Sequence, residues 1–278
     1  MTTRPLLPVL LVAAAGCDPN RTVPDRNAYV PQTVAPLECV PNLDGRIEAT
    51  ELKTALGVPV RYLVNPTGTR RPVDLAGVTD GAGRRIWQLS TDYADDQLAT
   101  ISASTLEGKW YRASFPSGQF VAPLDLGGAI EAVYLNDGAT LLLLGYASKD
   151  EAPAVGKTLV VYSSPIAALR FPVTPGQQWI SASEVRNATV RGLPYAGRDT
   201  YTLRIDAAGT LDLPDVTFTQ AMRLRTMLSI EPAVGASVIR RQTGFFFECF
   251  GEVARAVSAD NEANDDFTQT TELRRLGF

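Results

Sequence analysis

Tyr201-Thr202-Leu203-Arg204-Ile205-Asp206 is the stretch that decides the fold, because apolar and polar residues alternate along it without interruption. Successive side chains of a β-strand point to opposite faces, so Tyr201, Leu203 and Ile205 share one face. The following Ala207-Ala208-Gly209 predicts a hairpin turn into a second strand over residues 210–213. The body is therefore expected to be antiparallel β.

Working outward, the same pattern recurs on both sides of this stretch. A further alternating segment covers residues 222–228, and short apolar runs bounded by turn residues predict buried strands at 141–144, 159–162 and 245–250. Turn residues stand at 136–138, 175–176 and 197, and a strand over 58–64 precedes a turn at 65–68. The sequence thus predicts a mainly β body over 58–278, built as an antiparallel sandwich or a curved half-barrel. One short N-terminal helix is expected over Glu48–Leu56.

The N-terminus carries the pattern of an export signal. Arg4 is followed by an apolar run over residues 6–15, which is too short to span a bilayer. The run closes with Ala14-Ala15-Gly16-Cys17, which resembles the lipobox of bacterial lipoproteins. That resemblance implies a signal peptide over 1–16 and an acylated Cys17 as the new N-terminus. It also implies a membrane anchor facing the periplasm or the cell surface of a Gram-negative bacterium.

Cysteine parity supports the lipobox over ordinary secretion. The chain has three cysteines, and a simple secreted protein would keep Cys17, Cys39 and Cys249, which is an odd set. If Cys17 carries lipid, the remaining pair is free to form a disulfide in an oxidising compartment. We therefore expect a bond between Cys39 and Cys249.

Residues 17–38 are expected to act as a tether. Four prolines and no glycine fall between residues 18 and 38. At about 3.1 Å per residue in polyproline II, such a segment reaches roughly 60 Å. The alternative is a strand that lies along the domain.

Residues 40–52 resemble the later part of an EF-hand or dockerin calcium loop, and residues 39–57 are predicted to form this loop and the short helix. The resemblance implies that Asn42, Asp44 and Glu51 would occupy ligand positions 3, 5 and 12. Val40 falls at position 1 and offers no ligand, so we expect no bound metal. The resemblance covers only this loop, and nothing in the β body resembles a characterised family.

Composition narrows the function mainly by exclusion. The chain has 278 residues, a net charge of −4 and no histidine. The acidic balance argues against nucleic acid as a partner. The absence of histidine removes Ser–His and Cys–His catalysis and most zinc sites, so neither a catalytic residue nor a cofactor is predicted.

We therefore expect a non-enzymatic cell-envelope lipoprotein that acts as a binding or structural module. One alternative is a periplasmic carrier of lipid or lipoprotein with an apolar cavity, and another is a carboxylate-dependent hydrolase. The partners would be the membrane, through the lipid, and either other envelope proteins or an apolar ligand. Candidate ligand-binding residues are Arg223 and Arg225, which share a strand face, and Phe245 and Phe247, which with Leu224 would line such a cavity.

Overall fold

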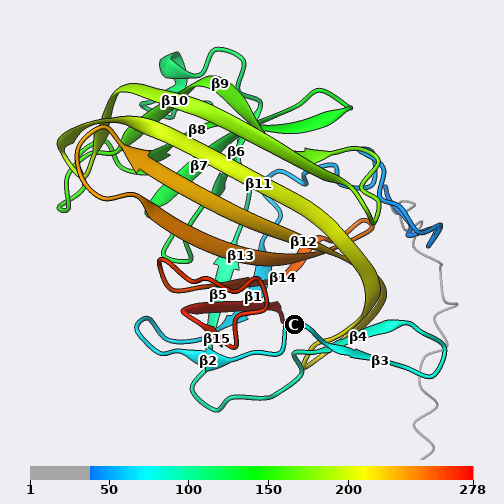
Figure 1. Ribbon diagram of the computed structural model, residues 1–278. Coiled ribbons are helices and arrows are strands. Elements are labelled where there is room, and N and C mark those ends of the chain that lie inside the picture. The colour runs from blue at the N-terminus through cyan, green and yellow to red at the C-terminus, as the bar shows by residue number, and fades with distance from the viewer. Residues whose placement is uncertain (1–37, 278) are drawn as a thin grey trace, which may run out of the picture. The chain divides into compact units, whose positions relative to one another are not determined.

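The computed structural model describes residues 38–277, and residues 39–277 belong to one compact unit (Figure 1). The expectations for residues 1–37, including acylation of Cys17, lie outside the described residues. The elements of the described part are β-strands and one turn of 3-10 helix, η1 (Arg112–Ser114). The strands are β1 (Val60–Val64), β2 (Arg71–Pro72), β3 (Val78–Thr79), β4 (Arg85–Gln88), β5 (Gln97–Ile101), β6 (Phe120–Pro123), β7 (Ile130–Asn136), β8 (Thr140–Ser148), β9 (Leu159–Arg170), β10 (Gln178–Val190), β11 (Leu193–Asp212), β12 (Thr217–Pro232), β13 (Val238–Phe247), β14 (Gly251–Val257), β15 (Gln269–Thr270) and β16 (Glu272–Leu276).

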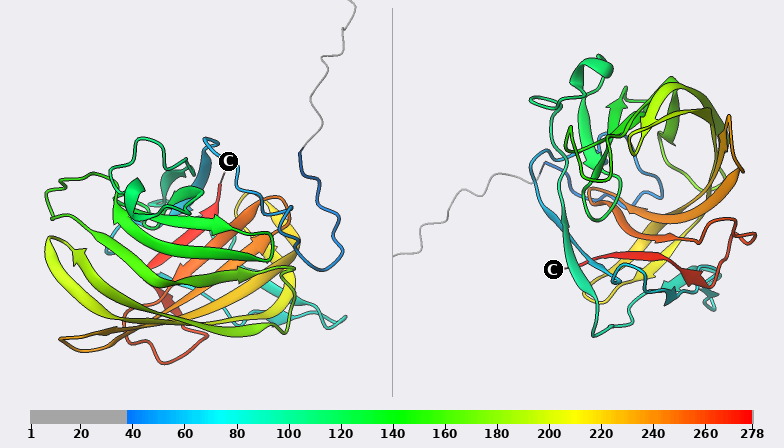
Figure 2. Two further views of the ribbon diagram at one scale, coloured as in Figure 1. Left: turned by 90° about the horizontal axis from the view of Figure 1, so that it is seen from above. Right: turned by 90° about the vertical axis from the view of Figure 1, so that its left-hand side faces the viewer.

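One mainly antiparallel sheet contains all of these strands except β2 and β15, which confirms the predicted β class. Its main path runs β5-β1-β16-β14-β13-β12-β11-β10-β9-β8-β7-β6, and β3 and β4 attach beside it. The sheet curls until its two edges meet, so it is nearly closed and barrel-like (Figure 2, right). Ser104, just beyond β5, forms the junction with Val121 of β6 through backbone bonds of 2.9 and 2.8 Å.

The long strand β11 confirms the alternation of Tyr201, Leu203 and Ile205 but not the turn after it. The strand continues through residues 207–209 to Asp212, with register shifts against β12 that mark bulges. Gly209 has no side chain, and the backbone of Arg85 in β4 occupies the space that a Cβ would need. The small residues at 207–209 therefore allow β4 to pair closely and in parallel with β11. The hairpin turn that the sequence predicted at these residues is not formed.

The predicted helix over 48–56 is absent, and this expectation was wrong. Residues 49–52 form an isolated turn, in which the Glu51 amide bonds to the Glu48 carbonyl at 3.0 Å. The Glu51 carbonyl accepts a bond from the amide of Cys249 at 2.9 Å. A helix would need that carbonyl for the amide four residues later, so the long-range bond ends the helical turn.

The outer surface of the sheet carries a core of its own. Trp87 of β4 and Phe245 of β13 are both fully buried, with ring centroids 5.0 Å apart. The segments around β2–β4 cover this part of β11–β13, while the opposite face of the same strands looks into the barrel-like sheet. These parts of β11–β13 are thus buried on both sides.

Candidate ligand-binding cavity

The inner face of the barrel-like sheet lines a partly open cavity of about 730 Å³. Strands β7 to β14 and β16 all contribute to its wall, together with the loops between β6 and β7 and between β8 and β9. Most of the lining side chains are apolar or aromatic. Those of the apolar part include Leu141, Leu143, Ile166, Leu203, Leu224 and Phe246.

Strand register explains why these residues meet. Tyr201 pairs with Leu228, and Leu203 pairs with Thr226, so alternate residues of β11 and β12 face the cavity together. Directly opposite residues of neighbouring strands project to the same face of a sheet. The predicted apolar face of β11 is thus the inner wall.

The cavity has a polar cluster toward one end, centred on Asp199. This aspartate is 3% exposed, and its Oδ2 accepts a bond of 2.8 Å from the Tyr162 hydroxyl. The Tyr162 and Tyr201 hydroxyl oxygens lie 3.2 Å apart, and the Tyr146 and Tyr162 rings have centroids 6.3 Å apart. The second carboxylate oxygen, Oδ1, is enclosed and has no hydrogen-bond partner.

Burial dominates the electrostatics of this cluster. It raises the pKa of Asp199, against the lowering effect of the bond from Tyr162. Burial also raises the pKa of Tyr162 well above its usual value, and nearby Tyr201 and Asp199 add to that increase. The cluster therefore disfavours negative charge, and a cation placed beside it would relieve that effect.

A second polar strip crosses the cavity wall on β14 and β16. The Arg255 Nε donates to Glu252 Oε1 at 2.8 Å, and the Arg274 Nη2 donates to Glu272 Oε1 at 2.8 Å. Glu252, Arg255 and Glu272 border the cavity. Each carboxylate of this strip is paired with an arginine, whereas Asp199 has no positively charged partner among residues 38–277.

Arg223 and Arg225 do share a strand face, as predicted, but both are buried and paired. Arg223 donates to both oxygens of Asp206, at 2.8 and 2.9 Å, and its guanidinium lies 4.9 Å from the Trp87 ring centroid. Arg225 donates to Asp206 at 2.6 Å and also to Asp266. Neither residue lines the cavity.

The predicted phenylalanines divide between the two faces of β13. Phe245 and Phe247 belong to the outer core with Trp87, whereas Phe246 faces the cavity together with Leu224. Register decides this, because Met222 pairs with Phe246 and Leu224 pairs with Gly244. Leu224 thus lines the cavity as predicted. The prediction was wrong for Phe245 and Phe247, because Phe246 between them lines the cavity instead.

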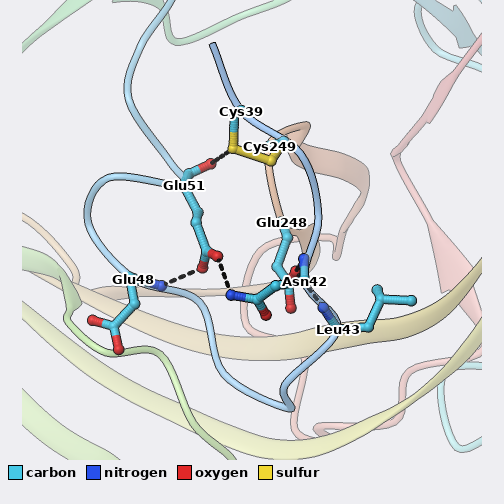
Figure 3. The surroundings of a disulfide bond; sticks show 7 residues. All are labelled: Cys39, Asn42, Leu43, Glu48, Glu51, Glu248 and Cys249. Atoms are coloured by element: carbon cyan, nitrogen blue, oxygen red, sulfur yellow. Dashed lines mark hydrogen bonds between the residues drawn. A yellow bond between two sulfur atoms is a disulfide. The ribbon is translucent and has the colours of Figure 1, made fainter. Parts of the chain in front are cut away.

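The calcium-like loop is held by its own side chains and by Glu248 from outside the loop (Figure 3). The Glu51 carboxylate accepts bonds from the Asn42 amide at 2.9 Å and from the Glu48 backbone at 2.8 Å. The Asn42 backbone bonds to buried Glu248 at 2.7 Å, and Asp44 pairs with Arg46. The three residues proposed as ligands thus have partners within the protein. Residues 38–277 contain no group of three or more acidic or cysteine side chains able to hold a metal ion.

The predicted disulfide is present. Cys39 and Cys249 are joined, with Cα atoms 5.6 Å apart, and the bond ties the start of the described chain to the β13–β14 turn (Figure 3). Such a bond is typical of an oxidising environment. Within residues 38–277 there is no helix of the length and apolarity needed to cross a membrane.

Sequence reasoning missed Asp199 and its tyrosines as a site. The signal was present, because Asp199 stands two residues before Tyr201 and therefore shares its inward phase. A charged residue in the apolar phase of a buried strand marks a position with a special role. The partners Tyr146 and Tyr162 lie on other strands, so only the fold could bring them together.

Comparison of the chain with protein family models, with curated proteins and with solved structures gives no match. The functional argument therefore depends on the cavity itself.

Proposed function

We propose that this protein is an exported, lipid-anchored binding protein that holds an apolar ligand within its barrel-like sheet. The cavity of about 730 Å³ carries the proposal. Small-molecule sites measure roughly 300–1,000 Å³ and combine apolar walls with a few polar groups. Small barrels with no ligand fill their interior with side chains, so an open interior favours a carrier over a purely structural module.

Anchoring through Cys17 is the second part of the proposal. The lipobox-like residues 14–17 support it, and so does the disulfide that leaves Cys17 as the remaining cysteine. Intact-mass analysis of membrane-fraction protein should show an acylated Cys17 as the N-terminal residue. Cys17→Ser should release the protein from the membrane fraction. An unmodified Cys17 in the mature chain would refute the anchor but leave the cavity proposal standing.

Ligand binding is tested by filling the cavity. Leu228 lines the cavity, whereas Ile180 of β10 is 67% exposed and lies outside the lining. N-Phenyl-1-naphthylamine, a neutral apolar fluorophore, should bind the wild type with a blue shift and increased emission. Leu228→Trp should weaken that binding at least about tenfold, because an indole occupies the space of the probe.

Ile180→Trp is the matched control, since it adds the same indole to the outer side of the sheet. It should bind the probe like the wild type. The proposal fails if the wild type does not bind the probe, or if both variants bind it as the wild type does.

A further inference from the structure

We propose that the polar cluster around Asp199 binds a positively charged amine head group, so that the ligand is a long-chain amine. This inference rests on the proposed function, because the alkyl chain would occupy the apolar part of the same cavity. It goes further by assigning the ligand a head-group charge and by placing that charge at a named residue.

The unpartnered oxygen of Asp199 is the first observation. Buried carboxylates usually accept several hydrogen bonds, and one left unmade is unfavourable. Tyr162 holds Oδ2, while Oδ1 is enclosed and has no partner. The terminal torsion of an aspartate is soft, so the carboxylate can turn its free oxygen toward the cavity that it borders. An ammonium group offers three N–H donors to such an oxygen.

The surrounding tyrosines are the second observation. Tyr146, Tyr162 and Tyr201 border the cavity from three different strands, β8, β9 and β11. Tyrosine rings attract cations through their π-faces, and their hydroxyl oxygens accept hydrogen bonds. Aromatic groups around a carboxylate are therefore suited to a cation and poorly suited to an anion.

The balance of charge around the cluster agrees with this assignment. The titratable groups that act on it are the tyrosines at 134, 146, 162, 195 and 201, and Arg240 of β13. Arg240 is paired with Asp260, and both side chains are about half exposed. Among these groups, none supplies an enclosed positive charge to Asp199. Because burial raises the pKa of Asp199, binding of an amine should release a proton near that pKa.

The division of the cavity suits an amphiphile. Asp199 pairs with Ile230, which in turn pairs with Val238 at the first residue of β13. Phe246 lies near the other end of β13, beside the β13–β14 turn. The head-group cluster and the apolar wall around Phe246 are thus separated along the strands, as the two parts of a long-chain amine are.

The test compares ligands of one chain length that differ only in the head group. Dodecylamine, dodecanol and dodecanoate are titrated at pH 7, below their micelle concentrations, by displacement of N-phenyl-1-naphthylamine. The amine should bind at least about tenfold more tightly than the alcohol, because hydrogen bonds to charged groups are worth at least this factor. Dodecanoate should bind more weakly than the alcohol, since it places a second negative charge beside Asp199.

Two variants assign the preference to the cluster. Asp199→Asn keeps the shape but removes the charge, and it should cancel the preference for amine while leaving dodecanol affinity within about twofold. Asp260→Asn removes an exposed carboxylate that pairs with Arg240, and it should keep the preference. Circular dichroism and thermal unfolding check that both variants fold.

The outcomes separate this inference from the proposed function. Equal affinity for all three ligands, or a preference for amine that survives in Asp199→Asn, overturns the amine site while the carrier proposal stands. Failure of the wild type to bind the fluorophore and every ligand overturns both.

Discussion

At the scale of single residues, two aspartates of β11, buried Asp199 and partly buried Asp206, show opposite electrostatic behaviour. Asp206 lies against Arg223 and Arg225, and their hydrogen bonds and charges outweigh the effect of its burial and lower its pKa. Asp199 has only a tyrosine hydroxyl, so burial prevails and raises its pKa. Asp206 therefore stabilises the folded protein through its ion pairs, whereas Asp199 lowers its stability at neutral pH.

Asp206→Ala should lower the free energy of unfolding at pH 7 by about 3–5 kcal/mol, because it leaves two buried arginines without a shared partner. Asp260→Ala breaks the exposed pair with Arg240 and should change it by no more than about 1 kcal/mol. Urea denaturation of both variants measures the difference. Equal effects would contradict the structural role given to Asp206.

The pH dependence of this stability has a defined sign. The pKa of Asp206 in the folded state lies below its ordinary value of 3.8. Its contribution is therefore fully present above that value and is lost as the pH falls through the folded pKa. Asp206→Asn should consequently flatten the acid side of the stability curve.

Asp199→Asn should have the opposite effect and raise the free energy of unfolding at pH 7. The pKa of Asp199 in the folded state lies above its ordinary value of 3.8, so the folded state binds the proton more tightly. The contribution of Asp199 to stability is then greatest below pH 3.8 and is lost as the pH rises through the folded pKa. Asparagine lacks this titration, and urea denaturation at pH 3 and pH 7 should show the gain only at the higher pH.

At the scale of elements, the sequence predicted what alternation alone determines. The inward face of β11 follows from the period of two around Tyr201, and the hairpin between β7 and β8 follows from the turn residues at 136–138. Predictions from local sequence were wrong where a segment distant in the sequence contacts the backbone. Gly209 serves the approach of β4, and the amide of Cys249 ends the helical turn at Glu51.

The phase of β13 illustrates the same limit. Three consecutive phenylalanines follow Gly244, and the sequence does not say which of them faces inward. A register shift between Phe245 and Phe246 in the pairing with β14 adds a local change of direction. Only pairing with β12 assigns Phe246 to the cavity.

The loop over residues 40–52 should bind calcium only at millimolar concentration or more weakly. Both oxygens of Glu51 already accept hydrogen bonds, and Val40 supplies no ligand at the first position. Calcium affinity depends on the number and charge of the oxygen ligands. Calorimetric titration of the metal-free protein provides the measurement. A micromolar dissociation constant that disappears in Glu51→Gln would contradict this expectation.

At the scale of the whole molecule, the two edges of the sheet meet at a small junction. The long strands β10 to β13 make extended ladders, whereas the edge strands β5 and β6 have only five and four residues. Ser104 and Val121 join these edges through two backbone hydrogen bonds. An unpaired edge strand exposes backbone N–H and C=O groups that can pair with another chain. The junction therefore also protects the sheet against aggregation through its edges.

Ser104→Pro should open this junction, because proline has no amide to donate to the Val121 carbonyl. The free energy of unfolding should fall by about 1–3 kcal/mol, the usual effect of leaving a partly buried acceptor unpaired. Hydrogen exchange should accelerate in β6 and β5 but not in β11 and β12, whose ladders are unchanged.

Ser102→Pro, at an exposed position outside the bridge, is the control and should leave β6 protected. Because the cavity wall includes β7 but neither edge strand, ligand affinity should fall only as far as opening at the edges spreads to β7. Unchanged exchange in β6 would mean that side-chain packing, not the Ser104–Val121 pair, keeps the sheet closed.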